Sequence, residues 1–155
     1  MTKCVLPNVP RVLEQDVYLL TMDDYSPHSL LGGEVIGNHV AQWQYAVDLT
    51  YRCLASGLWK LLDEDFLSTS GVGDIRGLCI ELSRLDPFNL LAEGQPYWLD
   101  TLMCAADPLL KIICEYQLDT SSGLFREGFF GAIDRQFAMV GCPWSKGCLF
   151  PVGMA

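Results

Sequence analysis

An apolar stripe at steps of three or four residues runs from about residue 34 to residue 62. Steps of that size place side chains on one face of an α-helix. Polar residues, including Asp48 and Arg52, fall largely outside this stripe. We therefore predict a long helix at the centre of the fold, which bends or ends at Gly57 and continues as a cover segment over residues 58–62. The stripe consists of Ile36, Val40, Trp43, Val47, Tyr51, Leu54, Leu58 and Leu61.

A second periodic segment predicts a shorter helix over residues 74–85, with Asp74 as its N-cap. Residues 132–140 are expected to form a last short helix. Residues 1–15 and the tail from Gly141 are expected to be irregular. The periodic residues of the second segment are Ile75, Leu78, Cys79 and Leu82.

Prolines mark two further expected helix starts, because proline is common at the first helical position. Asp86-Pro87 predicts a short helix that ends before Gly94, and Pro96 predicts another that extends through Ala106. Residues 16–22 form an apolar run that is too short to separate a strand from a buried helix.

Residues 109–118 fit two structures. They can continue as a helix after Asp107-Pro108, or they can form a strand, because apolar residues alternate with polar ones along most of the segment. The turn-forming residues 119–123 indicate a hairpin into residues 124–130, and we therefore favour the strand.

These patterns predict a mainly α protein, with α+β possible. We expect a compact helical domain around the long central helix, with a possible small β-hairpin near residues 110–130. The chain has 155 residues, which is the length of one ordinary domain and enough to bury a core. No internal repeat is visible, so residues 1–155 are expected to form one globular domain.

The charge balance narrows the possible partners. The formal net charge is −9, and half of the residues are hydrophobic. A negative field repels nucleic acid and anionic lipid, so neither is expected as a partner. A basic protein is the natural counterpart, because opposite charge speeds encounter. The alternative is that the charge only keeps an apolar domain in solution.

The chain shows no apolar run of the length that a signal peptide or a membrane span needs. We therefore expect a cytoplasmic protein.

The seven cysteines are widely spaced and include no CxxC pair. Cysteines in apolar helical segments behave as small hydrophobic residues, so reduced core thiols are expected. Cys142 and Cys148 lie in the segment GCPWSKGC and could meet in space. Two ligands do not make a zinc site, and His28 and His39 lie far away in the sequence, so no metal and no cofactor are expected.

Catalytic chemistry has few candidates, and we assign no catalytic residue. A thiol enzyme would need a cysteine beside a histidine, for example Cys142 with His28. Carboxylate catalysis would need one buried acid with a raised pKa. The sequence contains neither a GxSxG motif nor a P-loop.

Acidic residues cluster beside aromatic ones at two places, Asp23-Asp24-Tyr25 and Asp63-Glu64-Asp65-Phe66. Aromatic and charged side chains carry much of the energy of protein interfaces. Solvated loops are the alternative. The predicted partner-binding residues are Tyr18, Asp23, Asp24, Tyr25, Asp63, Glu64 and Asp65.

Two segments, EQDVYLLTMDDYS at residues 14–26 and YRCLASGLWKL at residues 51–61, carry a resemblance to a known family. They resemble small bacterial immunity proteins of polymorphic or contact-dependent toxin systems. The resemblance implies a protein without catalysis that binds a cognate toxin and blocks its active site or an essential surface. It also implies a basic partner, since many such toxins are basic nucleases.

The leading hypothesis is therefore an immunity-type protein that neutralises a basic toxin by occlusion. One alternative is a small carboxylate- or thiol-dependent enzyme. Another is a structural or scaffold subunit of a larger assembly, with an exposed apolar patch around Phe129, Phe130 and Trp144. The oligomeric state is left open.

Overall fold

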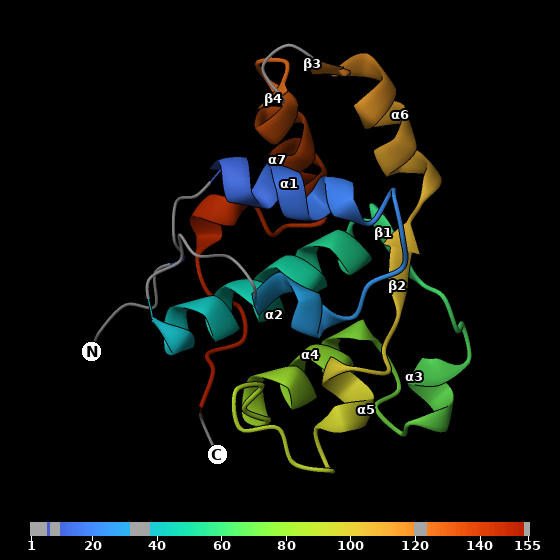
Figure 1. Ribbon diagram of the computed structural model, residues 1–155, viewed down its shortest axis with the longest axis vertical. Helices are drawn as coiled ribbons and strands as arrows, with labels where there is room; N and C mark the ends of the chain where they lie inside the picture. Colours follow the sequence, from blue (N-terminus) through green and yellow to red (C-terminus); the bar gives the residue numbers. More distant parts are fainter. Residues whose placement is uncertain (1–5, 7–9, 32–37, 120–123, 154–155) are drawn as a thin grey trace.

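A computed structural model describes residues 6, 10–31, 38–119 and 124–153 of the chain (Figure 1). It is mainly helical and compact, with small antiparallel sheets, so the predicted fold class is confirmed. The helices are α1 (Pro10–Leu19), α2 (His39–Ala55), α3 (Phe66–Thr69), α4 (Ile75–Arg84), α5 (Gln95–Trp98), α6 (Asp107–Glu115), α7 (Phe129–Met139) and the 3-10 helices η1 (Pro27–Leu31) and η2 (Trp144–Lys146). The strands are β1 (Trp59–Leu61), β2 (Met103–Ala105), β3 (Leu118–Asp119) and β4 (Leu124–Phe125).

Helix α2 lies at the centre, with α1 and α7 on one side and α4 and α5 on the other (Figure 1). It begins after Asn38, whose side-chain oxygen accepts a hydrogen bond from the amide of Ala41 at 2.9 Å. The predicted central helix and its end at Gly57 are confirmed; residues 34–37 of the predicted helix lie outside the described residues.

The segment after α2 is not a continuation of the helix. Gly57 has a φ of 80°, which favours glycine and turns the chain out of the helix. Leu58 and Trp59 are then buried in an extended chain whose last three residues form β1. Helical spacing across Gly57 therefore did not reveal that the chain changes direction there.

Helix α1 occupies a segment that was partly expected to be irregular. It begins at Pro10, which suits the first turn because its missing N–H would have no partner there. Leu13, Val17 and Leu20 are buried at helical spacing. With so few apolar residues, the periodic signal was too short to recognise.

Helix α6 replaces the strand that we favoured for residues 109–118. Asp107 and Pro108 lie in its first turn, and Ala106 is the N-cap. Leu109 and Ile112, three residues apart, are buried, whereas Leu110 is 43% exposed. The alternation was coincidental, because the side of the helix away from the core also carries apolar residues. The hairpin prediction is confirmed in a shorter form, with β3 paired to β4; the turn residues 120–123 lie outside the described residues.

Helix α4 confirms the prediction for residues 74–85, and the side chain of Asp74 accepts from the amide of Gly77 at 2.7 Å. Helix α7 begins earlier than predicted, at Phe129.

The proline-based predictions were wrong in extent. Asp86 caps a turn instead of a helix, since its carboxylate accepts from the amide of Phe88 at 2.9 Å. Helix α5 has a single turn, and Met103 belongs to β2. The capping chemistry was recognised correctly, but it does not require a helix to follow.

Strand β2 connects three separate parts of the chain. It pairs with β1 in the register Trp59↔Ala105, Lys60↔Cys104 and Leu61↔Met103. On its other side, the backbone of Tyr25 exchanges hydrogen bonds of 3.0 and 2.8 Å with Met103. This pairing brings the segments around residues 24 and 62 to the two sides of one strand.

A buried ion pair on α2 fixes the C-terminal tail, which is irregular apart from η2. Asp48 and Arg52 are both 0% exposed, and their side chains are 2.7 Å apart. Arg52 also donates to the carbonyl oxygens of Cys142, Pro143 and Gly147 at 2.9, 3.1 and 2.8 Å.

Asp48, the other residue of the ion pair, extends the same hydrogen-bond network. Asp48 accepts from the amide of Leu149 at 2.8 Å and from the side chain of Gln44. Gln44 donates to the carbonyl of Phe150 at 2.9 Å and accepts from the amide of Val152 at 3.0 Å. The predicted separation of polar residues from the buried stripe was therefore wrong for Asp48 and Arg52, which are buried because the tail covers them.

Candidate functional site

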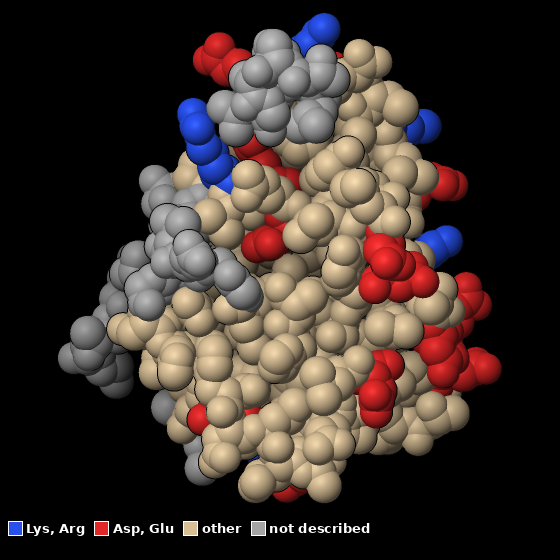
Figure 2. Space-filling view, viewed as in Figure 1, with Lys and Arg blue, Asp and Glu red and all other residues tan. Residues whose placement is uncertain are grey.

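Acidic residues from distant parts of the sequence gather around β2. Asp23 and Asp24 precede the residue that pairs with Met103. On the other side of β2, the amide of Leu62 donates to the carbonyl oxygen of Leu102 at 2.9 Å. The acidic residues 63–65 follow Leu62 directly in the sequence. We call this surface the acidic face; it consists of Asp23, Asp24, Asp63, Glu64, Asp65 and Asp100, all of which are exposed. Figure 2 shows acidic side chains gathered on its right-hand side, over β2 and α3.

The carboxylates of the acidic face have no cationic partner among the described residues. The ion pairs in the described part of the chain all lie outside the acidic face: they join Arg52 to Asp48 and Arg84 to Glu81 and Glu93. Within the acidic face the contacts are local, such as the amide of Asp65 donating to Asp63 at 3.0 Å. The carboxylates of this surface therefore form no ion pair in the described part of the chain, and they face solvent.

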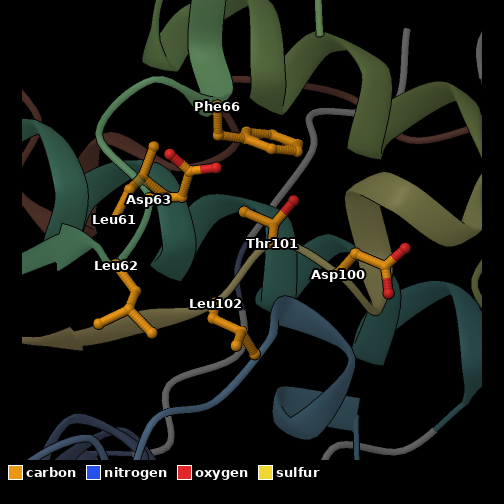
Figure 3. A pocket seen from close by; sticks show the side chains of 7 residues that line it. All are labelled: Leu61, Leu62, Asp63, Phe66, Asp100, Thr101 and Leu102. Atoms are coloured by element: carbon orange, nitrogen blue, oxygen red, sulfur yellow. The ribbon is translucent and has the colours of Figure 1, made fainter. Parts of the chain in front are cut away.

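A small hollow with a volume of about 140 Å³ opens in the acidic face between Asp63 and Asp100 (Figure 3). Two of its walls are apolar side chains that solvent reaches, Leu62 at 52% and Leu102 at 41% exposure. An apolar centre with a charged rim is the usual anatomy of a protein interface. The hollow is lined by Leu61, Leu62, Asp63, Phe66, Asp100, Thr101 and Leu102.

A second, wider hollow of about 380 Å³ adjoins the first across α3. Asp63 and Phe66 line the first hollow, whereas Glu64 and Leu67 line the second. The predicted cluster at residues 63–66 therefore borders both. Lys60 also lines the second hollow, where its charge opposes that of Glu64.

The two predicted tyrosines differ in their surroundings. Tyr25 is half-buried and its backbone joins β2, so it positions the acidic residues before it. Tyr18 lies on α1 and packs edge-on against Phe125 of β4 at 5.0 Å between ring centroids. Its ring contacts the hairpin instead of the acidic clusters.

Sequence reasoning missed Asp100 and Leu102. Asp100 belongs to no cluster, and Leu102 was one of the apolar positions of the helix predicted after Pro96. Only the pairing of β1 with β2 brings them beside Asp63. The Pro96 segment was expected to be helical throughout, and that expectation hid the strand.

Away from the acidic face, Asp16 is a carboxylate with a raised pKa. The hydroxyl of Tyr45 donates to its carboxylate at 2.6 Å. Burial raises the pKa of Asp16 to about 6, partly offset by that hydrogen bond. Burial also raises the pKa of the nearby Cys53 thiol well above its usual value, which keeps the thiol protonated and unreactive.

The remaining candidates for chemistry are not assembled. The ring of His39 stacks on Phe88, with centroids 4.2 Å apart. Cys142 is a free, buried thiol, whereas Cys148 is disulfide-bonded, so these two cysteines do not pair with each other. Within the described ranges, no group of three or more His, Cys, Asp or Glu residues could hold a metal ion.

The apolar patch that the scaffold hypothesis placed around Phe129, Phe130 and Trp144 is not formed. Phe129 is 0% and Trp144 is 7% exposed, because both belong to the core.

Comparisons with family models, with curated proteins and with solved structures find no match to this chain. Of the helices in the described part of the chain, none combines the length and the apolar character that crossing a membrane requires.

Proposed function

We propose that this chain is an acidic binding protein that occludes a basic protein partner with its acidic face. One observation carries the proposal: six exposed carboxylates from distant parts of the sequence share one surface, two of them line an apolar hollow, and none forms an ion pair in the described structure. Uncompensated charge steers an oppositely charged protein to the surface, and the apolar centre supplies area to bury there.

The more specific form of this proposal is an immunity-type protein of a bacterial toxin system that acts in the cytoplasm. It rests on the resemblance of residues 14–26 and 51–61. The toxin would be the basic partner, and covering its active site would be sufficient to neutralise it.

The experiment compares two matched charge reversals. Asp63→Lys with Glu64→Lys changes the acidic face. Glu115→Lys with Glu127→Lys makes the same change of charge at exposed residues outside the acidic face, at the last residue of α6 and just before α7; both helices lie in the upper part of Figure 1. Each variant is titrated calorimetrically with a basic toxin domain from the genes that flank its own, where such a gene is found, and is tested for rescue of cells that express this toxin.

We expect the first variant to bind at least about tenfold more weakly and to lose rescue, whereas the second changes affinity less than about threefold. Binding by the wild type should also weaken as salt is added. Equal affinity and equal rescue by the two variants would exclude the acidic face as the binding surface.

A carboxylate-dependent enzyme is the second candidate, and the environment of Asp16 favours it. A carboxyl whose pKa is raised to about 6 suits general acid–base catalysis near neutral pH. The test is an assay of ester, glycoside and phosphate hydrolysis by the wild type and by Asp16→Asn. Activity in the wild type that disappears in the variant would establish the enzyme, and the absence of activity in both would exclude these three hydrolyses.

A further inference from the structure

The size of the hollow in the acidic face decides what kind of group it accepts. Its volume is about 140 Å³. Pockets for small-molecule ligands and cofactors usually measure about 300–1,000 Å³. The hollow is therefore smaller than most such pockets, and a single side chain of a macromolecule is a group of suitable size.

The walls of the hollow match a long side chain with an apolar stem. Phe66 lies on one side of it, and Leu62 and Leu102 lie on the other (Figure 3). Phe66 is held by an edge contact with Tyr97, at 6.4 Å between ring centroids. Lysine and arginine bury their methylene groups against apolar surfaces of this kind while their charged ends stay near water.

The polar groups of the hollow favour a cation. In Figure 3, Asp63 and Asp100 lie on either side of Thr101. The hydroxyl of Thr101 already donates to the carbonyl of Pro96 at 3.0 Å, so its hydrogen is not available to a ligand. The charged groups of the lining are the carboxylates of Asp63 and Asp100. Neither carboxylate has an ion pair among the described residues.

We propose that this hollow binds a single arginine side chain of the basic partner, so this inference rests on the proposed function. Arginine fits better than lysine for two reasons. Its planar guanidinium can donate to carboxylates on more than one edge, and it stacks on aromatic faces such as that of Phe66. A buried arginine surrounded by a polar rim is a frequent anchor of protein interfaces.

The probe is a short, otherwise neutral peptide with one central arginine, which is added to the full chain and followed by nitrogen-15 NMR. Matched peptides carry lysine or citrulline at the same position; citrulline keeps the shape of arginine without its charge. We expect the arginine peptide to shift the amide signals of Leu62, Phe66 and Leu102 most strongly, and to bind more tightly than the lysine peptide.

Two charge-neutralising variants locate the site. Asp63→Asn with Asp100→Asn removes both carboxylates of the hollow but keeps an oxygen acceptor for the amide of Asp65. Asp23→Asn with Asp24→Asn removes the same charge from the acidic face outside the hollow. The first pair should weaken arginine-peptide binding by about tenfold and the second by less than about twofold.

The outcomes separate this inference from the proposed function. Equal binding of the citrulline or lysine peptide, or equal effects of the two variant pairs, would refute the arginine site. If the arginine peptide fails while Asp63→Lys with Glu64→Lys still abolishes toxin binding, the hollow is not the anchor and the acidic face remains the interface. If that charge reversal has no effect on toxin binding, the proposed function itself fails.

Discussion

Two regions of this protein place charge in opposite circumstances. On α2, the carboxylate of Asp48 and the guanidinium of Arg52 are fully buried and contact each other. On the acidic face, carboxylates are exposed and form no ion pair in the described part of the chain. A carboxylate count alone would treat the two regions alike, although one holds the chain together and the other is free to meet a partner.

The difference teaches that hydrogen bonding, as much as burial, reveals what a charge does. The donors of Arg52 are taken up by Asp48 and by carbonyl groups of the tail. Its guanidinium also lies 5.0 Å from the ring of Trp144. Nothing is left to bind an outside group. Asp63, by contrast, accepts one local amide and otherwise faces an open hollow.

The largest effect is expected from breaking the buried pair. In Arg52→Met, Asp48 would remain as a buried charge without a cation, and the tail carbonyls would lose their donor. Removing one partner of a buried ion pair usually costs about 3–5 kcal/mol. We expect a loss of this size in the free energy of unfolding, measured by urea denaturation, together with faster hydrogen exchange at Leu149 and Val152.

Arg84→Met is the matched control, because Arg84 pairs with Glu81 but its side chain is 43% exposed. Exposed pairs contribute about 0–1 kcal/mol, so this variant should unfold close to the wild-type midpoint. Equal losses in both variants would mean that the buried network does not hold the tail as described.

The two regions also differ in how far sequence could predict them. Helical spacing predicted α2 and α4 because their cores are built from local periodicity. The same reasoning placed Asp48 and Arg52 outside the buried stripe. Helical spacing carries no information about the C-terminal tail, about a hundred residues away, that covers them. Burial on that side of α2 is a tertiary effect.

The acidic face shows the same division between local and distant information. The clusters at residues 23–25 and 63–66 were visible as composition. Their assembly around one strand was not, because it depends on the pairing of Leu61 and Tyr25 with Met103. Asp100, which adds a second carboxylate to the hollow, carried no signal of its own.

A pH experiment tests whether a third acid, Asp16, which is partly buried, destabilises the folded protein when its carboxyl ionises. Its folded-state pKa of about 6 lies above the usual value of 3.8, so the folded state favours the protonated carboxyl. The resulting stabilisation is present below pH 3.8 and is lost as the pH rises through about 6. We expect Asp16→Asn, which is always neutral, to be more stable than the wild type above that range by about 1–3 kcal/mol.

The readout is the difference in unfolding free energy between Asp16→Asn and the wild type across this pH range. A difference is needed because burial also raises the pKa of Glu14 and Asp48. Tyr45→Phe removes a hydrogen bond that lowers the pKa of Asp16, so it should move the loss of stability to higher pH. A difference that stays constant with pH would show that Asp16 titrates like an exposed acid.

The smallest effect on stability is expected at the acidic face itself. Glu64→Gln with Asp65→Asn removes two exposed charges, and the side chain of Asp65 makes no capping hydrogen bond to α3. Exposed substitutions of this kind usually change stability by less than about 0.5 kcal/mol. Neighbouring like charges repel, so at low salt the variant should unfold at an equal or slightly higher urea concentration than the wild type, and added salt should narrow the gap.

This last comparison decides how a loss of binding is to be interpreted. If stability is unchanged and the affinity for the basic partner falls, the carboxylates act in the complex and not in the fold. If the variant is destabilised by more than about 1 kcal/mol, the cluster supports α3 as Asp48 supports the tail. The two regions would then not differ in role, because the charges of both would stabilise the fold.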